Sequence, residues 1–167
     1  MNPETETNLK NAFAGESQAH MKYMIFAERA EREGFPNVAR LFRAASFSEQ
    51  LHATNHLRAL NGVGKTLANV ETALAGETYE ITTMYPAYIS QAEQQGEDKA
   101  RGTMADALEA EKIHAALYTR AKEAVAAGRD VELPKLWVCS TCGYTVEGEP
   151  PDRCPICKAS RKAFKEF

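Results

Sequence analysis

Apolar side chains recur every third or fourth position along most of this 167-residue chain. This spacing predicts four long amphipathic helices, each with one apolar stripe. We expect them over about residues 2–33 and 36–61, from about residue 70 onward, and over 96–127. Gly34 and Gly128 follow the first and last helices in the position that commonly ends a helix. Pro86 lies inside the third helix and predicts a kink there.

Acidic side chains lie on these apolar stripes, where an unpaired carboxylate is costly. They form a pattern that occurs twice: a Gly-Glu pair on one helix, then Glu-x-x-His on the next. The two copies are 61 or 62 positions apart. The first copy is Glu16, Glu49 and His52, and the second is Glu77, Glu111 and His114. Because the Glu and His of each Glu-x-x-His are three residues apart, they share one helix face.

Four-helix bundles that hold two metal ions use this same set of residues, with one Glu from each of two helices and Glu-x-x-His from the other two. Five glutamates, counting Glu80, would meet two histidines in the bundle interior. Like charges and desolvation would keep most of these acids protonated unless cations lay between them. Carboxylates with imidazoles suit iron or manganese. The repeat therefore predicts a dinuclear metal site.

Glu80 breaks the symmetry, because the first copy has Ala19 at the matching position. We expect Glu80 to face the same side as His52, so that one metal has a choice of ligand. Ferric ion, the harder acid, should favour Glu80, and ferrous ion should accept His52. This is a hypothesis of redox-coupled ligand exchange.

Two tyrosines occupy comparable places in the repeat. Tyr23 follows Glu16 by seven residues, whereas Tyr85 follows Glu77 by eight. Core tyrosines usually pack and place their hydroxyl on a nearby acceptor. Here the expected acceptors are the ligand carboxylates, which gives both tyrosines a supporting role at the metal site.

The tail from about residue 135 has no helical period and holds all four cysteines. Cys139 and Cys142 form one C-x2-C pair, and Cys154 and Cys157 form another, with eleven residues between the pairs. This spacing predicts a tetrahedral four-thiolate metal site. The spacing alone leaves zinc and iron open. Iron is favoured by context, because a redox-active dinuclear site needs an electron supply.

Composition narrows the possible partners and location. A net charge of −3 gives no reason to expect nucleic acid or an anionic membrane as a partner. No apolar run approaches the ~18–20 residues of a membrane span. The polar N-terminus does not read as a secretory signal. Clustered cysteines without such a signal favour metal binding in a reducing compartment, so we expect a cytoplasmic protein. We place the domain boundary between residues 1–130 and 131–167.

On these motifs the chain resembles the rubrerythrin family over essentially its whole length. The match includes the two Glu…Glu-x-x-His copies, then Cys-x-x-Cys-Gly-Tyr and Cys-Pro-x-Cys. The resemblance implies a mainly α fold: a ferritin-like diiron four-helix bundle, then a small rubredoxin-like domain. It also implies roles for the residues: Glu16 and Glu77 as terminal iron ligands, Glu49 and Glu111 as bridges, His114 as a fixed imidazole, His52 and Glu80 as the exchanging pair, Tyr23 and Tyr85 as their supports, and Cys139, Cys142, Cys154 and Cys157 as ligands of a single iron.

The activity implied by the resemblance is reduction of hydrogen peroxide to water, a peroxidase function in oxidative-stress defence. Electrons would return through the rubredoxin-like centre from a separate reductase or rubredoxin, with a nicotinamide nucleotide as their source. Two alternatives stay open: a ferroxidase or iron store, and a redox sensor or electron-transfer protein.

The connection between the second and third helices bears on assembly. Ferritin-like bundles need a long crossover there, but only about eight residues, 62–69, are available. Fully extended they reach roughly 27 Å, which barely matches the expected span. We therefore expect a homodimer in which helix pairs are exchanged between two chains.

Overall fold

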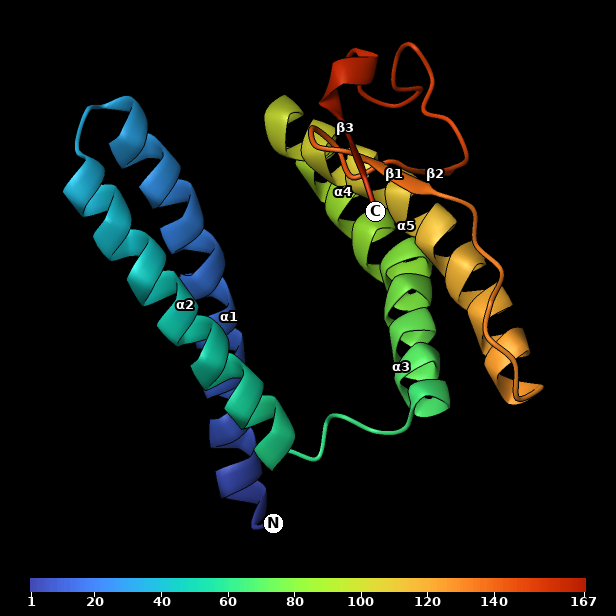
Figure 1. Cartoon of the computed structure of the whole chain (residues 1–167), viewed down its shortest axis with the longest axis horizontal. Helices are drawn as coiled ribbons and strands as arrows, with labels where there is room; N and C mark the ends of the chain where they lie inside the picture. The colour runs from blue at the N-terminus through green and yellow to red at the C-terminus, as the bar shows by residue number, and fades with distance from the viewer. The chain divides into compact units, whose positions relative to one another are not determined.

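The computed structural model describes all 167 residues, and it is mainly α-helical with a small sheet at the C-terminal end (Figure 1). The helices are α1 (Pro3–Arg32), α2 (Pro36–Ala59), α3 (Thr66–Tyr79), a π-helical turn η1 (Glu80–Met84), α4 (Tyr85–Gln94) and α5 (Asp98–Ala126). The strands are β1 (Leu136–Cys139), β2 (Thr145–Glu147) and β3 (Phe164–Glu166), with a 3-10 turn η2 (Arg161–Ala163) before β3. The fold class is as predicted. The chain divides into two compact units, residues 1–64 and 65–167.

The first unit is an antiparallel hairpin of α1 and α2 (Figure 1). Asn2 caps α1 by accepting a hydrogen bond from the Glu4 backbone N–H, and Gly34 turns the chain with φ of +83°. The buried positions between the two helices are small residues, which lets the backbones approach closely. They are Ala27, Ala30, Ala39, Ser46 and Ala53.

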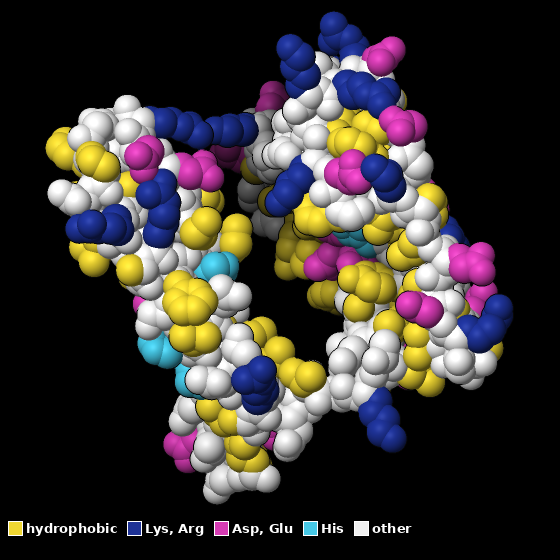
Figure 2. Space-filling view, viewed as in Figure 1, with side chains coloured by type: hydrophobic (Ala, Val, Ile, Leu, Met, Phe, Trp, Pro, Cys, Tyr) yellow, Lys and Arg dark blue, Asp and Glu magenta, His cyan; other side chains and the backbone are white.

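Within this unit, large apolar side chains are left in contact with solvent. They include Met21, Ile25, Phe26, Phe47 and Leu51, each between 45% and 59% exposed. Figure 2 shows such side chains on the surface of the hairpin. A large exposed apolar surface on a soluble protein usually marks an interaction site. The hairpin alone therefore supplies only part of a hydrophobic core.

The second unit begins with α3, η1 and α4, which together form one long interrupted helix packed on α5. Its first helix starts at Thr66, four residues earlier than expected, so only residues 60–65 connect it to α2. The irregularity predicted near Pro86 takes the form of the π-turn η1, which ends two residues before that proline. No helix is both long enough and apolar enough to cross a membrane.

The sheet of the second unit has strand order β2-β1-β3, with both pairings antiparallel. Its core consists of Cys139, Cys154 and Phe164, with Trp137 and Tyr144 packed against them. The sheet is tied to α5 by Arg120, whose guanidinium lies 2.6 Å from Glu147 Oε2 and also donates to the Glu132 carbonyl. Because α5 also carries Glu111 and His114, this contact brings the cysteine-bearing tail against the helix that holds the second predicted Glu-x-x-His pair.

Candidate metal centres

The α1–α2 hairpin brings together the first predicted ligand group. His52 Nδ1 lies 2.9 Å from Glu49 Oε2 and 3.8 Å from Glu16 Oε1. Glu16 comes from α1, whereas Glu49 and His52 share one face of α2. The two carboxylates are partly buried, and the imidazole is about half exposed. The three side chains have donor atoms within 4.8 Å of one another, so they can hold one ion together.

The second unit repeats this geometry. His114 Nδ1 lies 2.7 Å from Glu111 Oε2 and 3.9 Å from Glu77 Oε2. Each distance is within 0.2 Å of its counterpart in the first group. The repeat seen in the sequence is therefore also a repeat in three dimensions. Each unit carries one of the two ligand groups predicted from the repeat.

The second group has the chemistry of a cation site. Glu77 Oε2 is buried and has no hydrogen-bond partner. Burial, followed by the hydrogen bond and negative charge of Glu111, raises the pKa of Glu77 to about 7. A metal-ligating Nδ1 must be unprotonated, and it then repels a carboxylate at this distance unless a cation lies between them. The donors fit iron, which accepts both carboxylate and imidazole.

Glu80 is the first residue of the π-turn, and Tyr85 directly follows its last residue. Burial, followed by the charge of Glu111, raises the pKa of Glu80. Burial also raises the pKa of Tyr85, and the charges of Glu80, Glu111 and Glu77 raise it further. The charges of three carboxylates therefore act on the phenol of Tyr85, and its supporting role stays a prediction.

Tyr23 lies in a different environment. Its ring packs against Phe26 and Phe42, with centroid distances of 6.3 and 5.9 Å. Its predicted place beside a ligand carboxylate remains a prediction. The nearby His20 is structural, because its Nδ1 lies 2.9 Å from the Ser46 hydroxyl, which itself donates to the His20 carbonyl.

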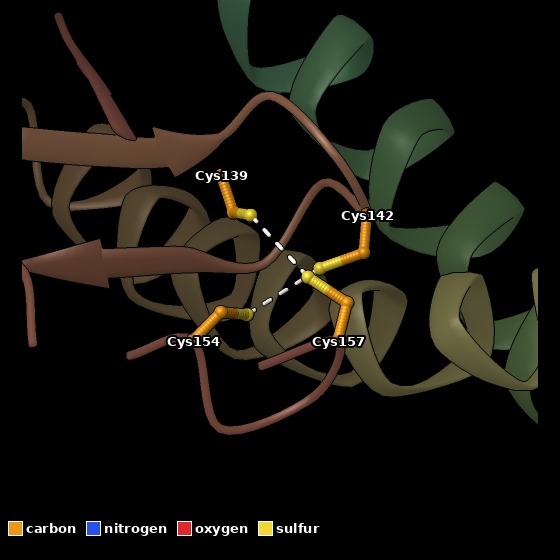
Figure 3. A group of neighbouring side chains, drawn as sticks. All are labelled: Cys139, Cys142, Cys154 and Cys157. Atoms are coloured by element: carbon orange, nitrogen blue, oxygen red, sulfur yellow. Dashed lines mark hydrogen bonds between the residues drawn. The ribbon is translucent and has the colours of Figure 1, made fainter. Parts of the chain in front are cut away.

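The four cysteines form a compact group in which the sulfur atoms point toward one another (Figure 3). Cys139 Sγ and Cys157 Sγ are 3.7 Å apart, and Cys142 Sγ and Cys154 Sγ are 3.5 Å apart. A tetrahedral ion with metal–sulfur bonds of ~2.3 Å requires sulfur separations of ~3.8 Å. Left-handed turns at Gly143 and Lys158 follow the two pairs and fold each loop back on itself. The group is therefore shaped for one tetrahedral metal.

The thiols of this group differ in how readily they ionise. Burial opposes ionisation of Cys139, but the N–H groups of Thr141 and Cys142 and the neighbouring thiols outweigh it and lower its pKa to about 7. Burial raises the pKa of Cys142 and of Cys157. Four thiolates cannot coexist here without a cation, which again indicates a bound metal.

One residue of the site was not predicted. Thr145, the first residue of β2, has its hydroxyl oxygen 2.9 Å from His114 Nε2. The two residues are 31 positions apart and belong to different predicted domains. No spacing rule connects a helix histidine with a strand threonine, so the sequence holds no signal for this contact.

Family models of known proteins match both parts of the chain. The rubrerythrin model matches residues 7–122, and the model of the rubredoxin-like domain of rubrerythrin matches residues 137–165. The chain belongs to the rubrerythrin family. The first match alone covers more than half of the chain. The two matches lie on either side of the boundary predicted at residues 130 and 131, which itself stays a prediction.

Relatives within the rubrerythrin family match the chain from end to end. Rubrerythrin-2 of Clostridium acetobutylicum is 38% identical, over 99% of this chain and 98% of the relative. Nigerythrin of Nitratidesulfovibrio vulgaris is 35% identical, over 98% of this chain and 86% of the relative. A solved structure of fully reduced, all-ferrous nigerythrin matches with a TM-score of 0.53 and 34% identity, over 98% of this chain and 86% of that chain. Rubrerythrins are non-haem diiron oxidoreductases with a rubredoxin-like domain, so both centres of this chain point to iron.

Proposed function

We propose that this rubrerythrin is a peroxidase that reduces hydrogen peroxide to water in defence against oxidative stress. The observation that supports this best is the pairing of two different redox centres. The carboxylate–histidine group on α5 and the four-cysteine group are tied together within one compact unit. A ferroxidase or iron store has no need of a built-in four-cysteine site, whereas an enzyme that must be re-reduced after each turnover does.

The ligands of the iron pair would be the two matched groups, supplemented by Glu80. These are Glu16, Glu49, His52, Glu77, Glu80, Glu111 and His114. The iron pair, when bound, supplies two electrons to the O–O bond, and two protons are needed to form two waters from one peroxide. A tyrosine phenol is protonated at neutral pH, and burial with the nearby carboxylate charges raises the pKa of Tyr85 further. Its hydroxyl can therefore donate a hydrogen bond to a peroxide oxygen or to a ligand carboxylate.

Glu80 and His52 are the residues that we propose to exchange as ligands. Glu80 sits in the π-turn, where the regular helix is interrupted. His52 is about half exposed, and its Nε2 has only a long contact of 3.5 Å to Ser48 Oγ. The interrupted helix at Glu80 and the half-exposed ring of His52 support alternative positions for both side chains. Structures of the oxidised and reduced protein with identical ligands at that metal would exclude the exchange.

Rapid mixing of the fully reduced protein with peroxide, and separately with oxygen, tests the peroxidase proposal. We expect the visible absorption of oxidised iron to appear much faster with peroxide. Preference for oxygen would favour a ferroxidase, and slow reaction with both would favour a sensor. Protein whose four-cysteine site holds zinc is the matched control, because its tail stays folded. It should complete one turnover but not multiple turnovers with an external reductase or rubredoxin as donor.

We also propose that the protein is a homodimer with exchanged helix pairs. Only residues 60–65 connect α2 with α3, and Ala59 and Thr66 can be at most ~25 Å apart. In a ferritin-like arrangement this connection runs from the end of the second helix to the far end of the bundle. About 30 Å of helix lies between those ends, measured along the axis through Glu49 and Glu77, and helices are spaced ~10 Å apart. The connection is too short, so each α1–α2 hairpin would complete the site of a second chain.

The exposed apolar surface of the α1–α2 hairpin supports this assembly. Side chains such as Ile25, Phe47 and Leu51 are about half exposed or more within their own unit. Burying one of them fully against a second chain would contribute roughly half of the ~1.5–3 kcal/mol that complete burial of such a side chain provides, because the other half is already buried.

A further inference from the structure

The buried hydroxyl of Thr145 lies between the two metal centres of the second unit. Thr145 is 5% exposed. Its Oγ1 lies 2.9 Å from His114 Nε2, and it donates to the Gly143 carbonyl at 3.1 Å. When His114 ligates a metal through Nδ1, its Nε2 carries the hydrogen and can only donate. The Thr145 oxygen then accepts from Nε2, and the single hydroxyl proton serves the Gly143 carbonyl, which can only accept.

A neutral imidazole with hydrogen on Nε2 has its free lone pair on Nδ1. Nδ1 is the atom of His114 that faces the carboxylates, at 2.7 Å from Glu111 Oε2. A metal ligand must present this lone pair, and ligating histidines commonly donate their other N–H to a neighbouring acceptor that fixes the ring. Thr145 supplies that acceptor from a different domain.

We propose that Thr145 is a positioning residue that holds His114 as the permanent imidazole ligand of the site. This rests on the proposed iron centre, and it assigns to a residue of the rubredoxin-like domain a role in the carboxylate–histidine site. Thr145 acts through His114, because the two hydrogen-bond partners of its hydroxyl are the His114 imidazole and the Gly143 carbonyl.

The first half-site provides the comparison. His52 has the same contact to its glutamate as His114, but its Nε2 reaches only Ser48 Oγ at 3.5 Å. The His52 side chain is 51% exposed, against 29% for His114. The two halves therefore differ in how firmly the imidazole is held, although their ligand sets are alike. This difference explains physically why His52 can leave a metal while His114 stays.

The Thr145 contact also links the two centres. Gly143 directly follows the ligand Cys142, and a Cβ added at Gly143 would lie 3.8 Å from the Ala110 side chain, one residue before Glu111. The cysteine loop thus rests on the turn of α5 that carries the metal ligands. Two hydrogen bonds, from His114 to Thr145 and from Thr145 to Gly143, connect the imidazole to the backbone of that loop.

Thr145→Val tests the proposal because valine keeps the shape of threonine and removes its hydroxyl. The measurement is the rate at which a chelator extracts iron from the carboxylate–histidine site of the purified iron-loaded protein. We expect about 10-fold faster release, in the range found for groups that orient metal ligands. Thr145→Ser should restore the rate to within about 3-fold of wild type, because serine keeps the hydroxyl that accepts from the imidazole.

Arg120→Gln is the matched control. It removes the ion pair with Glu147 that ties the same sheet to α5 but leaves Thr145 and His114 in place. Should Thr145→Val not fold, judged by the emission of the single tryptophan, Thr145→Ala removes the same hydroxyl without placing a second methyl group against the imidazole. The proposal would be overturned if the hydroxyl-free variant released iron at the wild-type rate, or if Arg120→Gln released it as fast as the hydroxyl-free variant. Failure of Thr145→Ser to restore the slow rate would overturn it too. Failure of the wild-type protein to react with peroxide would instead reject the proposed function, and the iron-release rates of the Thr145 variants would still test the role of Thr145.

Discussion

The backbone N–H of Tyr85 donates to the carbonyl of Glu80, five residues earlier. This is a π-type bond, which stacks residues five apart where an α-helix stacks residues four apart. It explains an oddity of the repeat, in which Tyr85 follows Glu77 by eight residues and Tyr23 follows Glu16 by seven. The π-turn accommodates the extra residue and keeps Glu80 and Tyr85 on the side of the metal ligands.

Removing the extra residue should therefore remove the π-turn without moving Tyr85. Pro86 complicates this, because a proline in a continuous α-helix costs about 3 kcal/mol. We predict that deletion of Thr82 combined with Pro86→Ala folds with a continuous helix and binds iron like Pro86→Ala alone. The variant that lacks Thr82 but retains Pro86 should have a free energy of unfolding about 3 kcal/mol lower than the variant that combines the deletion with Pro86→Ala. The measurements are thermal unfolding and iron content.

The control for this deletion is removal of Gln18, an exposed residue between Glu16 and Tyr23 in a regular part of α1. A deletion in a regular helix rotates the part of α1 after residue 18 by about 100° relative to the part that carries Glu16, so the two parts cannot both keep their packing on α2. Deletion of Gln18 should therefore abolish iron binding. Equal damage from both deletions would contradict our reading of the π-turn.

The ligand set was predictable because spacing alone encodes it. Glu49 and His52, three apart on a helix, must share a face, and the second copy repeats the pattern in Glu111 and His114. The π-turn was only hinted at by one extra residue, since helical periodicity assumes an uninterrupted α-helix. The bond between His114 and Thr145 depends on how a strand docks on a helix, and no local pattern specifies that contact.

The buried carboxylates predict a pH-dependent stability of the metal-free protein. The pKa of Glu77 is raised to about 7 by burial and by Glu111. Between its ordinary value and pH 7 the folded state therefore binds more protons than the unfolded state, so stability falls as pH rises. We expect the melting temperature of metal-free protein to drop between pH 5 and pH 8.

Two comparisons check this pH dependence. Glu77→Gln should flatten the curve, because an amide cannot ionise. Iron loading should flatten or reverse it, because a bound cation favours the carboxylate. Melting curves followed by circular dichroism supply the data. A metal-free protein that becomes more stable from pH 5 to pH 8 would show that Glu77 is not held in its neutral form.

Loss of one cysteine should unfold the tail and spare the helices. The tail is too small for a self-sufficient core, so its metal supplies most of the folding energy. Trp137, the only tryptophan of the chain, packs in this core and reports on it alone. We predict that Cys142→Ser shifts its emission to longer wavelength while the helical circular dichroism changes little. The measurement uses zinc-loaded protein, because iron would quench the fluorescence of Trp137. Ser140→Ala, in the same loop, is the control and should leave the emission unchanged. An unshifted emission would mean that the sheet folds without metal.

Exchange of helix pairs predicts that two inactive chains restore one site. One variant carries Glu16→Gln, Glu49→Gln and His52→Ala, and the other carries Glu77→Gln, Glu111→Gln and His114→Ala. Alone, neither can form a complete site in any dimer. Co-expressed with different tags and purified as a mixed dimer, they should hold one complete site, because the intact second half of one chain meets the intact first half of the other.

The mixed dimer should contain about half of the wild-type iron in carboxylate–histidine sites and regain peroxide reactivity in proportion. The four-cysteine iron serves as an internal count of chains, since neither variant alters it. In a dimer without exchange each site has its two halves from one chain, so every site of the mixed dimer lacks one half. An iron content no higher than in the single variants would therefore reject exchange. Residues 60–65 would then have to span the bundle, which their length allows only if α2 or α3 is shorter than in this structure.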